Sequence, residues 1–338
     1  MMSEMKQSPL VEVNHLKKYF NVGKNRFLHA VDDVSFTVAP GETLGLVGES
    51  GCGKSTVGNL AVNLLAPDSG QVLFRGQNVH TSRGTQAAEL KKKIQLIFQD
   101  PYSSLNPAKT IYQILSEAFL VNGVKKGPEM DRRIHELIEM TGLEEYLLGK
   151  FPHELDGGRR QMVGIVRCLS MNPEFIVCDE PVSALDVSVQ ATIINLLMDM
   201  QEKLGIAYLF ISHDLSVVKH ISHRIAVMYL GQIVEIADKE TIFRNTLHPY
   251  SIALLSAVPN VDFENQTSRI VLKGDVPSPV NPAPGCRFAG RCWMAGEKCF
   301  QENPALQEME EGHFVACHYC RQSREKYADL LQEMKEEN

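Results

Sequence analysis

The sequence has no excess of basic residues. Its 338 residues include 34 Lys and Arg against 41 Asp and Glu, which gives a formal net charge of -7. Nonspecific binding to nucleic acid or to anionic lipid depends on a positive field that this balance does not provide. We therefore expect no nucleic-acid partner.

Long apolar runs are missing as well. No run approaches the roughly 18 residues that a membrane-spanning helix needs. The first ten residues, MMSEMKQSPL, contain no continuous apolar core of the kind found in secretory signals. We expect a cytoplasmic protein that meets the inner face of the membrane only through partners. With 44% hydrophobic and 22% charged residues, the chain is typical of a globular protein of about two domains.

Cysteine is unevenly distributed. A cytoplasmic chain keeps its thiols reduced, so the eight cysteines do not predict a disulfide framework. Four of them follow the spacing C-x5-C-x6-C-x17-C, namely Cys286, Cys292, Cys299 and Cys317. Four thiolates suit an iron–sulfur cluster or tetrahedral zinc. Structural zinc usually has a closely spaced cysteine pair, which only Cys317 and Cys320 would form, and unligated thiols are the third interpretation.

Apolar and alternating runs divide the chain into strands and helices. Strands are expected at LVEVN (10–14), VSFTV (34–38), TLGLV (43–47), QVLFR (71–75), IQLIF (94–98), FIVC (175–178), AYLFI (207–211), IAVMYL (225–230) and QIVEI (232–236). A helix should follow Asp186 as N-cap and end at Gly205. We predict an α/β fold with a mostly parallel sheet in residues 1–245, a helical insertion at about 106–164, and a small Cys-rich extension at 246–338.

A phosphate-binding loop is the clearest motif. Residues 48–55 fit G-x-x-x-x-G-K-[ST], between the strand TLGLV and an amphipathic helix. Backbone N–H groups of such a loop surround the phosphates of ATP, the lysine neutralises charge, and the hydroxyl binds Mg²⁺. The plain alternative is a glycine-rich turn. The expected ATP-binding residues are Gly48, Ser50, Gly51, Cys52, Gly53, Lys54, Ser55 and Thr56.

A second carboxylate motif completes the expected site. The apolar run Phe175-Ile176-Val177-Cys178 ends in Asp179 and Glu180. Such a strand would deliver Asp179 to the Mg²⁺ that Ser55 also binds, and would place Glu180 beside the attacking water as general base. An apolar run that ends in two acids is weak evidence alone, and becomes strong when it accompanies a phosphate-binding loop.

The order of these motifs resembles that of ABC-transporter ATPases over residues 10 to 245. The motifs that carry the resemblance are Phe98-Gln99-Asp100-Pro101, Gly157-Gly158, Asp179-Glu180-Pro181, Ser183-Ala184-Leu185-Asp186 and Ile211-Ser212-His213-Asp214. The resemblance implies a RecA-like P-loop NTPase with an antiparallel β subdomain, working as a cassette dimer. It implies that Gln99 contacts Mg²⁺ and water, that His213 contacts the γ-phosphate, that Asp186 lies at the dimer interface, and that Phe20 stacks on adenine.

The signature motif departs from this family. The usual L-S-G-G-Q is replaced by Leu155-Asp156-Gly157-Gly158-Arg159. In the family this segment closes over the nucleotide of the partner cassette, so the Asp156 carboxylate would face a polyanion. Two like charges about 4 Å apart repel by roughly 4 kcal/mol at an effective dielectric near 20. The alternative is that Asp156 caps the following helix by accepting from the Arg159 N–H.

The tail is similar to that of oligopeptide/dipeptide importer ATPases. The similar segments are Pro101-Tyr102-Ser103-Ser104-Leu105-Asn106-Pro107, His248-Pro249-Tyr250, Pro284-Gly285-Cys286-Arg287-Phe288, Arg291-Cys292, Cys299 and Val315-Ala316-Cys317-His318. The resemblance implies peptide import driven by ATP and Mg²⁺, and a [4Fe-4S] cluster on the four cysteines. The partners it implies are a second, homologous ATPase subunit in a heterodimer, transmembrane permease subunits and, indirectly, an extracytoplasmic solute-binding protein.

Three alternatives stay open. Relatives of this family carry nickel, glutathione or sugars, which the sequence does not separate from peptides. A soluble ABC protein acting on the ribosome or DNA usually has two cassettes or basic surfaces, whereas this chain has one cassette and a net charge of -7. Glu180 and His213 argue against a regulatory subunit that does not hydrolyse ATP, and Asp156 argues partly for it.

Overall fold

The computed structural model describes residues 8–100, 105–257, 270–272, 274–323 and 326. Residues 101–104, which belong to one similarity segment of the tail family, lie outside this part. In the part of the chain that is described, no helix is long and apolar enough to cross a bilayer.

An eight-stranded sheet forms the centre of the molecule, in the order β11-β12-β10-β9-β3-β8-β7-β6. Five neighbouring strands are parallel, which confirms the predicted α/β class: β3 (Thr43–Val47), β6 (Ile94–Ile97), β7 (Phe175–Asp179), β8 (Ala207–Ser212) and β9 (Arg224–Tyr229). Strand β10 (Gln232–Asp238) returns antiparallel beside β9. The parallel strands are almost continuously apolar because both faces of the sheet are covered.

A second, antiparallel sheet packs against one face, in the order β2-β1-β4-β5. Its strands are β1 (Val11–Gly23), β2 (Arg26–Val38), β4 (Ser69–Phe74) and β5 (Gln77–Asn78). Helix α1 (Lys54–Ala61) lies between the two sheets, and apolar side chains of both sheets and of α1 form one buried core. Helix α2 (Gly84–Lys93) leads from this region into β6.

The opposite face of the central sheet is covered by helices. These are α7 (Val187–Leu204), α8 (Leu215–Ile221), α9 (Lys239–Arg244) and α10 (Pro249–Ser256), which share a second core with the sheet. The Asp186 side chain caps α7 by accepting from the Val189 N–H, and Gly205 ends it in the left-handed conformation. Both ends of this helix therefore lie where the sequence placed them.

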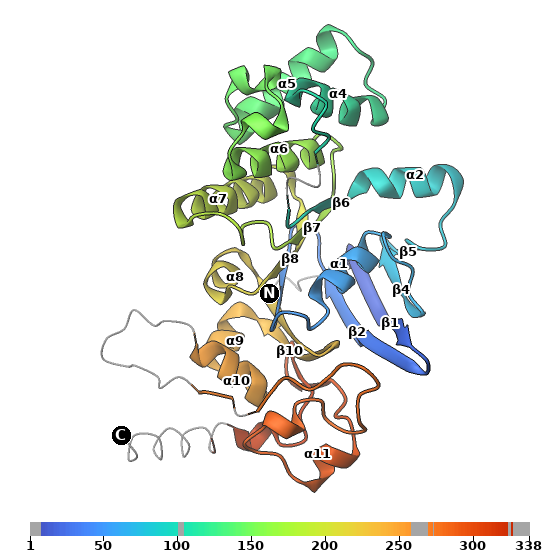
Figure 1. The fold of residues 1–338 in the computed structure, drawn as a ribbon, viewed down its shortest axis with the longest axis vertical. Helices are drawn as coiled ribbons and strands as arrows, with labels where there is room; N and C mark the ends of the chain where they lie inside the picture. Colours follow the sequence, from blue (N-terminus) through green and yellow to red (C-terminus); the bar gives the residue numbers. More distant parts are fainter. Residues whose placement is uncertain (1–7, 101–104, 258–269, 273, 324–325, 327–338) are drawn as a thin grey trace, which may run out of the picture.

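The helical insertion forms its own small core at one end of the molecule (Figure 1). It contains α4 (Ile111–Val121), α5 (Pro128–Thr141) and α6 (Gly157–Leu169), with short 3-10 turns at Glu145–Gly149 and Pro152–Glu154. Thr110 and Gln113 form a reciprocal capping box that fixes the start of α4. Helix α6 also contacts α7 and β6, so this end is joined to the central sheet.

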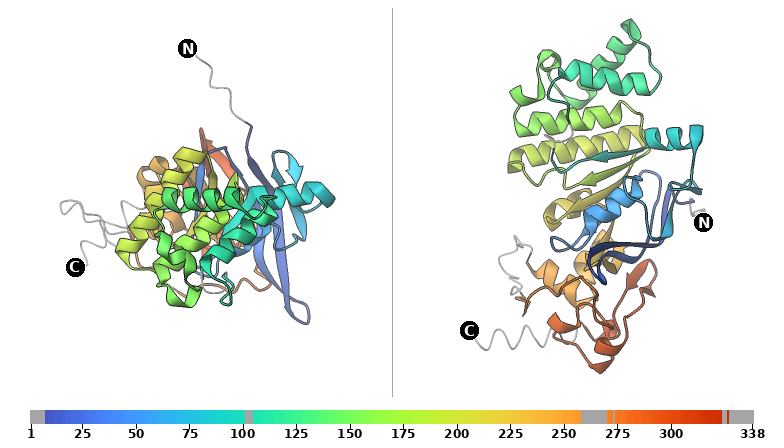
Figure 2. Two further views of the ribbon diagram at one scale, coloured as in Figure 1. Left: turned by 90° about the horizontal axis from the view of Figure 1, so that it is seen from above. Right: turned by 45° about the vertical axis from the view of Figure 1, so that its right-hand side comes forward.

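The extension after residue 246 is attached to the central sheet. Its strands β11 (Gln307–Glu310) and β12 (His313–Val315) pair with each other, and β12 pairs with β10. Short helical segments at Ala289–Arg291, α11 (Glu297–Gln301) and Cys320–Gln322 complete it. The insertion, the sheet and the extension follow one another along the long axis (Figure 2). Through the pairing of β12 with β10, the extension is continuous with the central sheet.

A fully buried carboxylate anchors this extension. Glu235, on β10, accepts from the backbone N–H groups of Leu247 and His248 at 2.7 and 3.1 Å. Its Oε1 also lies 2.8 Å from Nε2 of His313 on β12. These three contacts compensate the Glu235 carboxylate for the hydrogen bonds to water that it loses on burial. Without partners, a buried carboxylate would strongly destabilise the fold. Burial also lowers the pKa of His248 to about 4, so its ring is neutral at physiological pH.

Candidate active site

The motif residues meet at the carboxyl edge of the parallel strands. Strand β3 leads into the phosphate-binding loop, β7 into Asp179 and Glu180, β8 into His213, and β6 toward Gln99. The strands are in register, with Asp179 opposite Ile211. The loops after neighbouring parallel strands lie at the same edge, which is where ligands bind in open α/β sheets.

Two glycines allow the phosphate-binding loop its shape. Gly53 has φ +106°, and a Cβ at this position would lie 2.0 Å from the Ala30 carbonyl oxygen. A Cβ at Gly48 would lie 2.1 Å from the Met228 carbonyl oxygen. Lys54 is 5% exposed and donates from Nζ to the carbonyl oxygens of Gly48 and Glu49 at 2.8 and 3.1 Å. Its charge is thus held inside the loop, at the start of α1, where an anion is favoured.

The oxygen donors expected to bind Mg²⁺ lie together. The Ser55 hydroxyl donates to Asp179 Oδ1 at 2.9 Å. Burial is the largest influence on the Asp179 carboxyl and raises its pKa, and the charge of Glu180 raises the pKa further, while the Ser55 hydrogen bond and Lys54 lower it. A hydroxyl and a carboxylate beside a second carboxylate fit a hard divalent cation, which would relieve the repulsion between the acids.

Glu180 connects two other motifs. Its Oε2 accepts from Gln99 Nε2 at 3.1 Å and lies 3.2 Å from His213 Nδ1. The Glu180 side chain is 16% exposed, and its backbone adopts a left-handed φ of +46°. A non-glycine residue in this region carries conformational strain of a kind that is found at active sites. Side chains that follow β6 and β8 therefore meet at one carboxylate oxygen of the residue that follows β7.

A cavity of about 460 Å³ opens over these groups. It is lined by eleven of the predicted residues: Phe20, Ser50, Gly51, Cys52, Gly53, Lys54, Ser55, Thr56, Gln99, Glu180 and His213. Gly48 and Asp179 do not line it, but each is hydrogen-bonded to a lining residue, Gly48 to Lys54 and Asp179 to Ser55. The neighbouring Tyr19 does not line the cavity; its ring stacks on His29 at a centroid distance of 3.9 Å, and its hydroxyl donates to Asp32. Phe20 is thus the aromatic residue of this pair that faces the cavity.

Sequence reasoning missed six lining residues. They are Leu28, His29, Ala30, Leu230, Gly231 and Pro279. The first three belong to β2, the next two form the turn between β9 and β10, and Pro279 belongs to the extension at 246–338. Only the Leu230-Gly231 turn could have been suspected, since it too follows a parallel strand at the same sheet edge.

A second cavity of about 480 Å³ lies between β2, β10 and the extension. Asp32, Arg224, Arg287 and Phe314 are among its lining residues, together with Cys286. None of the residues predicted for ATP lines it. The phosphate-binding loop does not line this second cavity, so the cavity of about 460 Å³ is the candidate active site.

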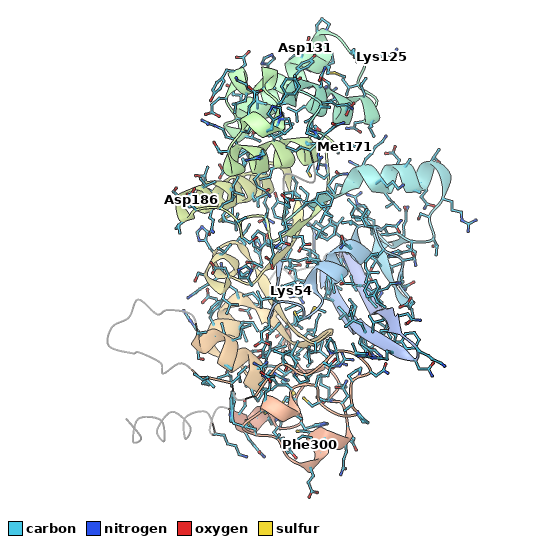
Figure 3. The ribbon with its side chains drawn as sticks, viewed as in Figure 1. Lys54, Lys125, Asp131, Met171, Asp186 and Phe300 are labelled. Carbon is cyan, nitrogen blue, oxygen red and sulfur yellow. The ribbon has the colours of Figure 1, made fainter. Side chains whose placement is uncertain are left out.

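The signature residues 156–159 and Asp186 lie apart from the candidate active site. Figure 3 shows Lys54 near the middle of the molecule and Asp186 at the start of α7. Gly158 packs so closely on α7 that a Cβ would lie 2.5 Å from Val189 Cγ1, and Gly157 lies beside Leu185. None of the five predicted signature and interface residues lines the cavity of the same chain.

Asp156 caps helix α6, as one of the two alternatives proposed. Its Oδ1 accepts from the Arg159 N–H at 2.8 Å, and its Oδ2 lies 3.2 Å from the Arg159 guanidinium. Arg159 also donates to Glu144 at 2.9 Å. The Asp156 side chain remains 57% exposed. Asp156 and Glu144 thus share the Arg159 guanidinium, and Arg160 donates from Nε to the Asp156 carbonyl oxygen at 3.2 Å.

The four predicted metal-binding cysteines surround one small apolar cavity of about 10 Å³. Burial raises the pKa of Cys286, raises that of Cys292 to about 11 and that of Cys317 to about 12. The Met294 and Tyr319 N–H groups each donate to the cysteine sulfur two residues earlier, at 3.4 Å. Among the described residues, however, no three His, Cys, Asp or Glu side chains are arranged to hold a metal ion.

Known proteins share both the fold and the sequence. The family described as ABC transporter matches residues 31–183. A solved structure titled as a dimeric post-hydrolysis state of the ATP-binding cassette MJ0796 bound to ADP and Pi superposes with a TM-score of 0.62 at 27% identity, covering 68% of this chain and 98% of that one. The chain is therefore an ATP-binding, ATP-hydrolysing cassette of the ABC class, a class whose cassettes act as dimers.

The extension and the whole-chain similarity narrow the class. The family described as Oligopeptide/dipeptide transporter, C-terminal region matches residues 234–299. The oligopeptide transport ATP-binding protein AppF of Bacillus subtilis is 47% identical, over 94% of this chain and 99% of its own length. The dipeptide transport ATP-binding protein DppF of Haemophilus influenzae is 45% identical, over 94% and 99%. The chain belongs to the oligopeptide/dipeptide family of ABC-transporter ATP-binding subunits, as the sequence motifs indicated.

Proposed function

We propose that this chain powers the import of oligopeptides or dipeptides by hydrolysing ATP at the inner face of the cell membrane. The observation that carries the proposal is similarity to peptide-transport ATP-binding proteins along nearly the whole chain, extension included. Its partners would be transmembrane permease subunits, a second homologous cassette, and, indirectly, an extracytoplasmic solute-binding protein. The solute itself is recognised by those other polypeptides.

The residues around the cavity suit in-line attack of water on ATP. Lys54 would turn its charge from the loop carbonyls to the phosphates, and the loop N–H groups would hold them in place. Ser55 and Asp179 would hold Mg²⁺, which supplies charge neutralisation at the phosphates when bound. Glu180 Oε2 would accept the proton of the attacking water, while Gln99 and His213, already at this oxygen, orient the water and the γ-phosphate. Phe20 would stack on the adenine.

The transported solute can be tested in a reconstituted complex. The chain is purified with its co-purifying membrane subunits and the matching solute-binding protein, and the complex is placed in liposomes. We expect ATP-dependent uptake of labelled dipeptides or tetrapeptides, with no uptake when ATP is omitted. Uptake of nickel or glutathione in place of peptides would assign the chain to the alternative importers. Co-purification with ribosomes instead of membrane subunits would contradict a transport role.

We infer that the two ATP sites of the dimer are unequal and that the partner is a different chain. The carboxylate of Asp156 is exposed at the N-terminus of α6, and Arg159 is shared with Glu144. When the dimer closes, this surface would approach the γ-phosphate in the partner's loop and weaken its binding by charge repulsion. The site built on Lys54, Asp179 and Glu180, closed by the partner's signature, lacks this repulsion.

Unequal sites lead to unequal mutational effects. We expect Glu180→Gln to reduce the ATPase rate of the complex far more than the same change in the partner's catalytic glutamate. The double change Asp156→Ser with Arg159→Gln should raise turnover at the partner's site, because the carboxylate is removed while serine still caps α6. Rates are measured on reconstituted complexes carrying one altered subunit each. Equal losses from the two glutamate variants would contradict unequal sites.

We also propose that Cys286, Cys292, Cys299 and Cys317 hold a [4Fe-4S] cluster, with zinc as the alternative. All four line one apolar cavity, and N–H groups already donate to two of the sulfurs, as is common for cluster thiolates. The bound group would cross-link four points of the extension. Binding requires that the thiols, whose pKa burial raises, release their protons to the solvent.

Purification without oxygen tests this proposal. We expect brown protein with visible charge-transfer absorption, and Cys292→Ser should remove the colour. Cys178→Ser is the matched control, because Cys178 is a buried thiol of β7 outside the cysteine cavity. Colourless protein with stoichiometric zinc would favour the alternative. Protein with neither iron nor zinc would show that the thiols are unligated.

A further inference from the structure

Arg291 of the extension forms an ion pair with a residue of the phosphate-binding loop. The Arg291 guanidinium donates from both terminal nitrogens to the two carboxylate oxygens of Glu49, at 2.9 and 3.2 Å. Its side chain is 9% exposed. Glu49 follows Gly48 in the loop, and Arg291 lies 242 residues further along the chain. A bidentate arginine–carboxylate pair of this kind fixes geometry more strictly than a single charge contact.

The same loop residue is held through its backbone. The Glu49 N–H donates to the Tyr250 hydroxyl at 2.8 Å. Tyr250 belongs to α10 and is fully buried, with its ring against Tyr229 and Phe288 at centroid distances of 4.6 and 5.5 Å. The Glu49 carbonyl oxygen in turn accepts from Lys54 Nζ. Glu49 is thus fixed from outside by two residues of the extension and from inside by the lysine of the loop.

A second arginine of the extension contacts the Leu230-Gly231 turn, which also lines the cavity. Arg287 donates to the Leu230 carbonyl oxygen and to Asp32. Next to Leu230, the Gly231 N–H donates to the carbonyl oxygen of Cys52 at 2.8 Å. Both arginines come from the short segment 286–292, whose two ends are cysteines. This segment therefore contacts the phosphate-binding loop directly and through the β9–β10 turn.

We propose that Arg291 is a positioning residue for ATP binding, which holds the phosphate-binding loop in place through Glu49. The extension would then contribute directly to the affinity of the cassette for ATP. Without Arg291, the Glu49 carboxylate is a bare negative charge in a loop that must receive a polyanion. The role concerns ATP affinity alone. It rests on ATP binding by the cassette and is independent of the transported solute.

The test compares four full-length chains: wild type, Arg291→Met, Glu49→Gln and the double variant. Affinity for the non-hydrolysable analogue AMP-PNP with Mg²⁺ is measured by titration calorimetry, and thermal unfolding midpoints are recorded in parallel. We expect Arg291→Met to raise the Kd on the order of tenfold, and Glu49→Gln to raise it by a smaller factor, because it breaks the bidentate pair without leaving a bare charge. The double variant should bind no more weakly than Arg291→Met, because both changes remove the same contact. Lys298→Met, an exposed lysine of α11 paired with Glu302, is the control and should bind as wild type.

The outcomes separate positioning from stability. If Arg291 served only to stabilise the fold, Arg291→Met would lower the unfolding midpoint and leave the Kd unchanged, which overturns the proposal. A double variant whose loss equals the two single losses combined would also overturn it, since Arg291 would then act independently of Glu49. A wild-type chain that failed to bind AMP-PNP would instead contradict the ATP site itself.

A second variant covers the case in which Arg291→Met does not fold. Tyr250→Phe removes only the hydroxyl that accepts from the Glu49 N–H, and leaves that N–H without its partner. We expect it to raise the Kd several-fold. Tyr208→Phe is the matched control, because Tyr208 is equally buried and its hydroxyl donates to Leu197 in α7. Equal affinities for these two variants would overturn the proposal.

Discussion

The substitution Lys54→Ala is expected to abolish measurable ATP binding. Lys54 is the buried cation of the phosphate-binding loop, and its Nζ donates to the carbonyl oxygens of Gly48 and Glu49. In the ATP complex, phosphate oxygens would take the place of these carbonyls. Losing two or three charge-assisted hydrogen bonds of about 1.5 to 3 kcal/mol each would weaken binding by more than 100-fold. Equilibrium titration of the full-length chain with Mg·AMP-PNP measures the effect.

A lysine outside the site provides the comparison. Lys203 lies exposed near the end of α7, 4.0 Å from Asp199, and Lys203→Ala should bind the nucleotide as wild type does. Because Lys54 contacts carbonyls of its own loop, loss of binding has to be separated from loss of fold. The variant should keep the far-UV circular dichroism of the wild type. A Lys54→Ala chain that bound the nucleotide with wild-type affinity would contradict the assignment of the loop.

The parts of the site that lie near one another in the sequence could be predicted from it. The loop at 48–55 is a contiguous motif whose glycines are required by φ values and close backbone contacts. Asp179, Glu180 and His213 follow apolar strands, and parallel strands bring their carboxyl ends together. The ends of α7 were also predictable, because an N-cap aspartate and a C-terminal glycine act locally.

Contacts between distant segments could not be predicted in this way. Nothing in the sequence around Arg291 indicates a partner at Glu49, and the role of Pro279 in lining the cavity has no local signal. The pairing of β12 with β10 is of the same kind, since a three-residue strand has too little periodicity to be recognised. Such contacts depend on tertiary packing. The same is true of Glu235, whose burial in an otherwise apolar strand has no local signal in the sequence.

For the four cysteines, the sequence predicts the ligand atoms but not the directions in which the side chains point. Their number and spacing predicted four thiols in one place, and the structure places all four around one cavity. Spacing does not specify the directions of the side chains on irregular backbone, and in the described residues these directions do not form a metal-binding set. Whether the thiols converge on a metal depends on the metal itself, because binding energy and folding of such a site are coupled.

The substitution Glu180→Gln should separate ATP binding from hydrolysis. Glutamine has the size of glutamate and can keep the contacts of Oε2 with Gln99 and His213, but its amide does not accept a proton from water. A general base contributes about 10²- to 10⁴-fold to a rate, so the ATPase rate of the assembled complex should fall by that factor. Affinity for Mg·ATP should stay within a few-fold of wild type, and the closed dimer should accumulate in size-exclusion chromatography.

Two comparisons make this result specific to the proton acceptor. Glu202→Gln changes an exposed glutamate near the end of α7 and should leave the rate unchanged. His213→Gln removes the ring at Oε2 while the carboxylate remains, so proton acceptance is retained and only the orientation of water and γ-phosphate is lost. If Glu180→Gln hydrolysed ATP at the native rate and His213→Gln did not, the base would be His213. The strained backbone at Glu180 would then serve to position that ring.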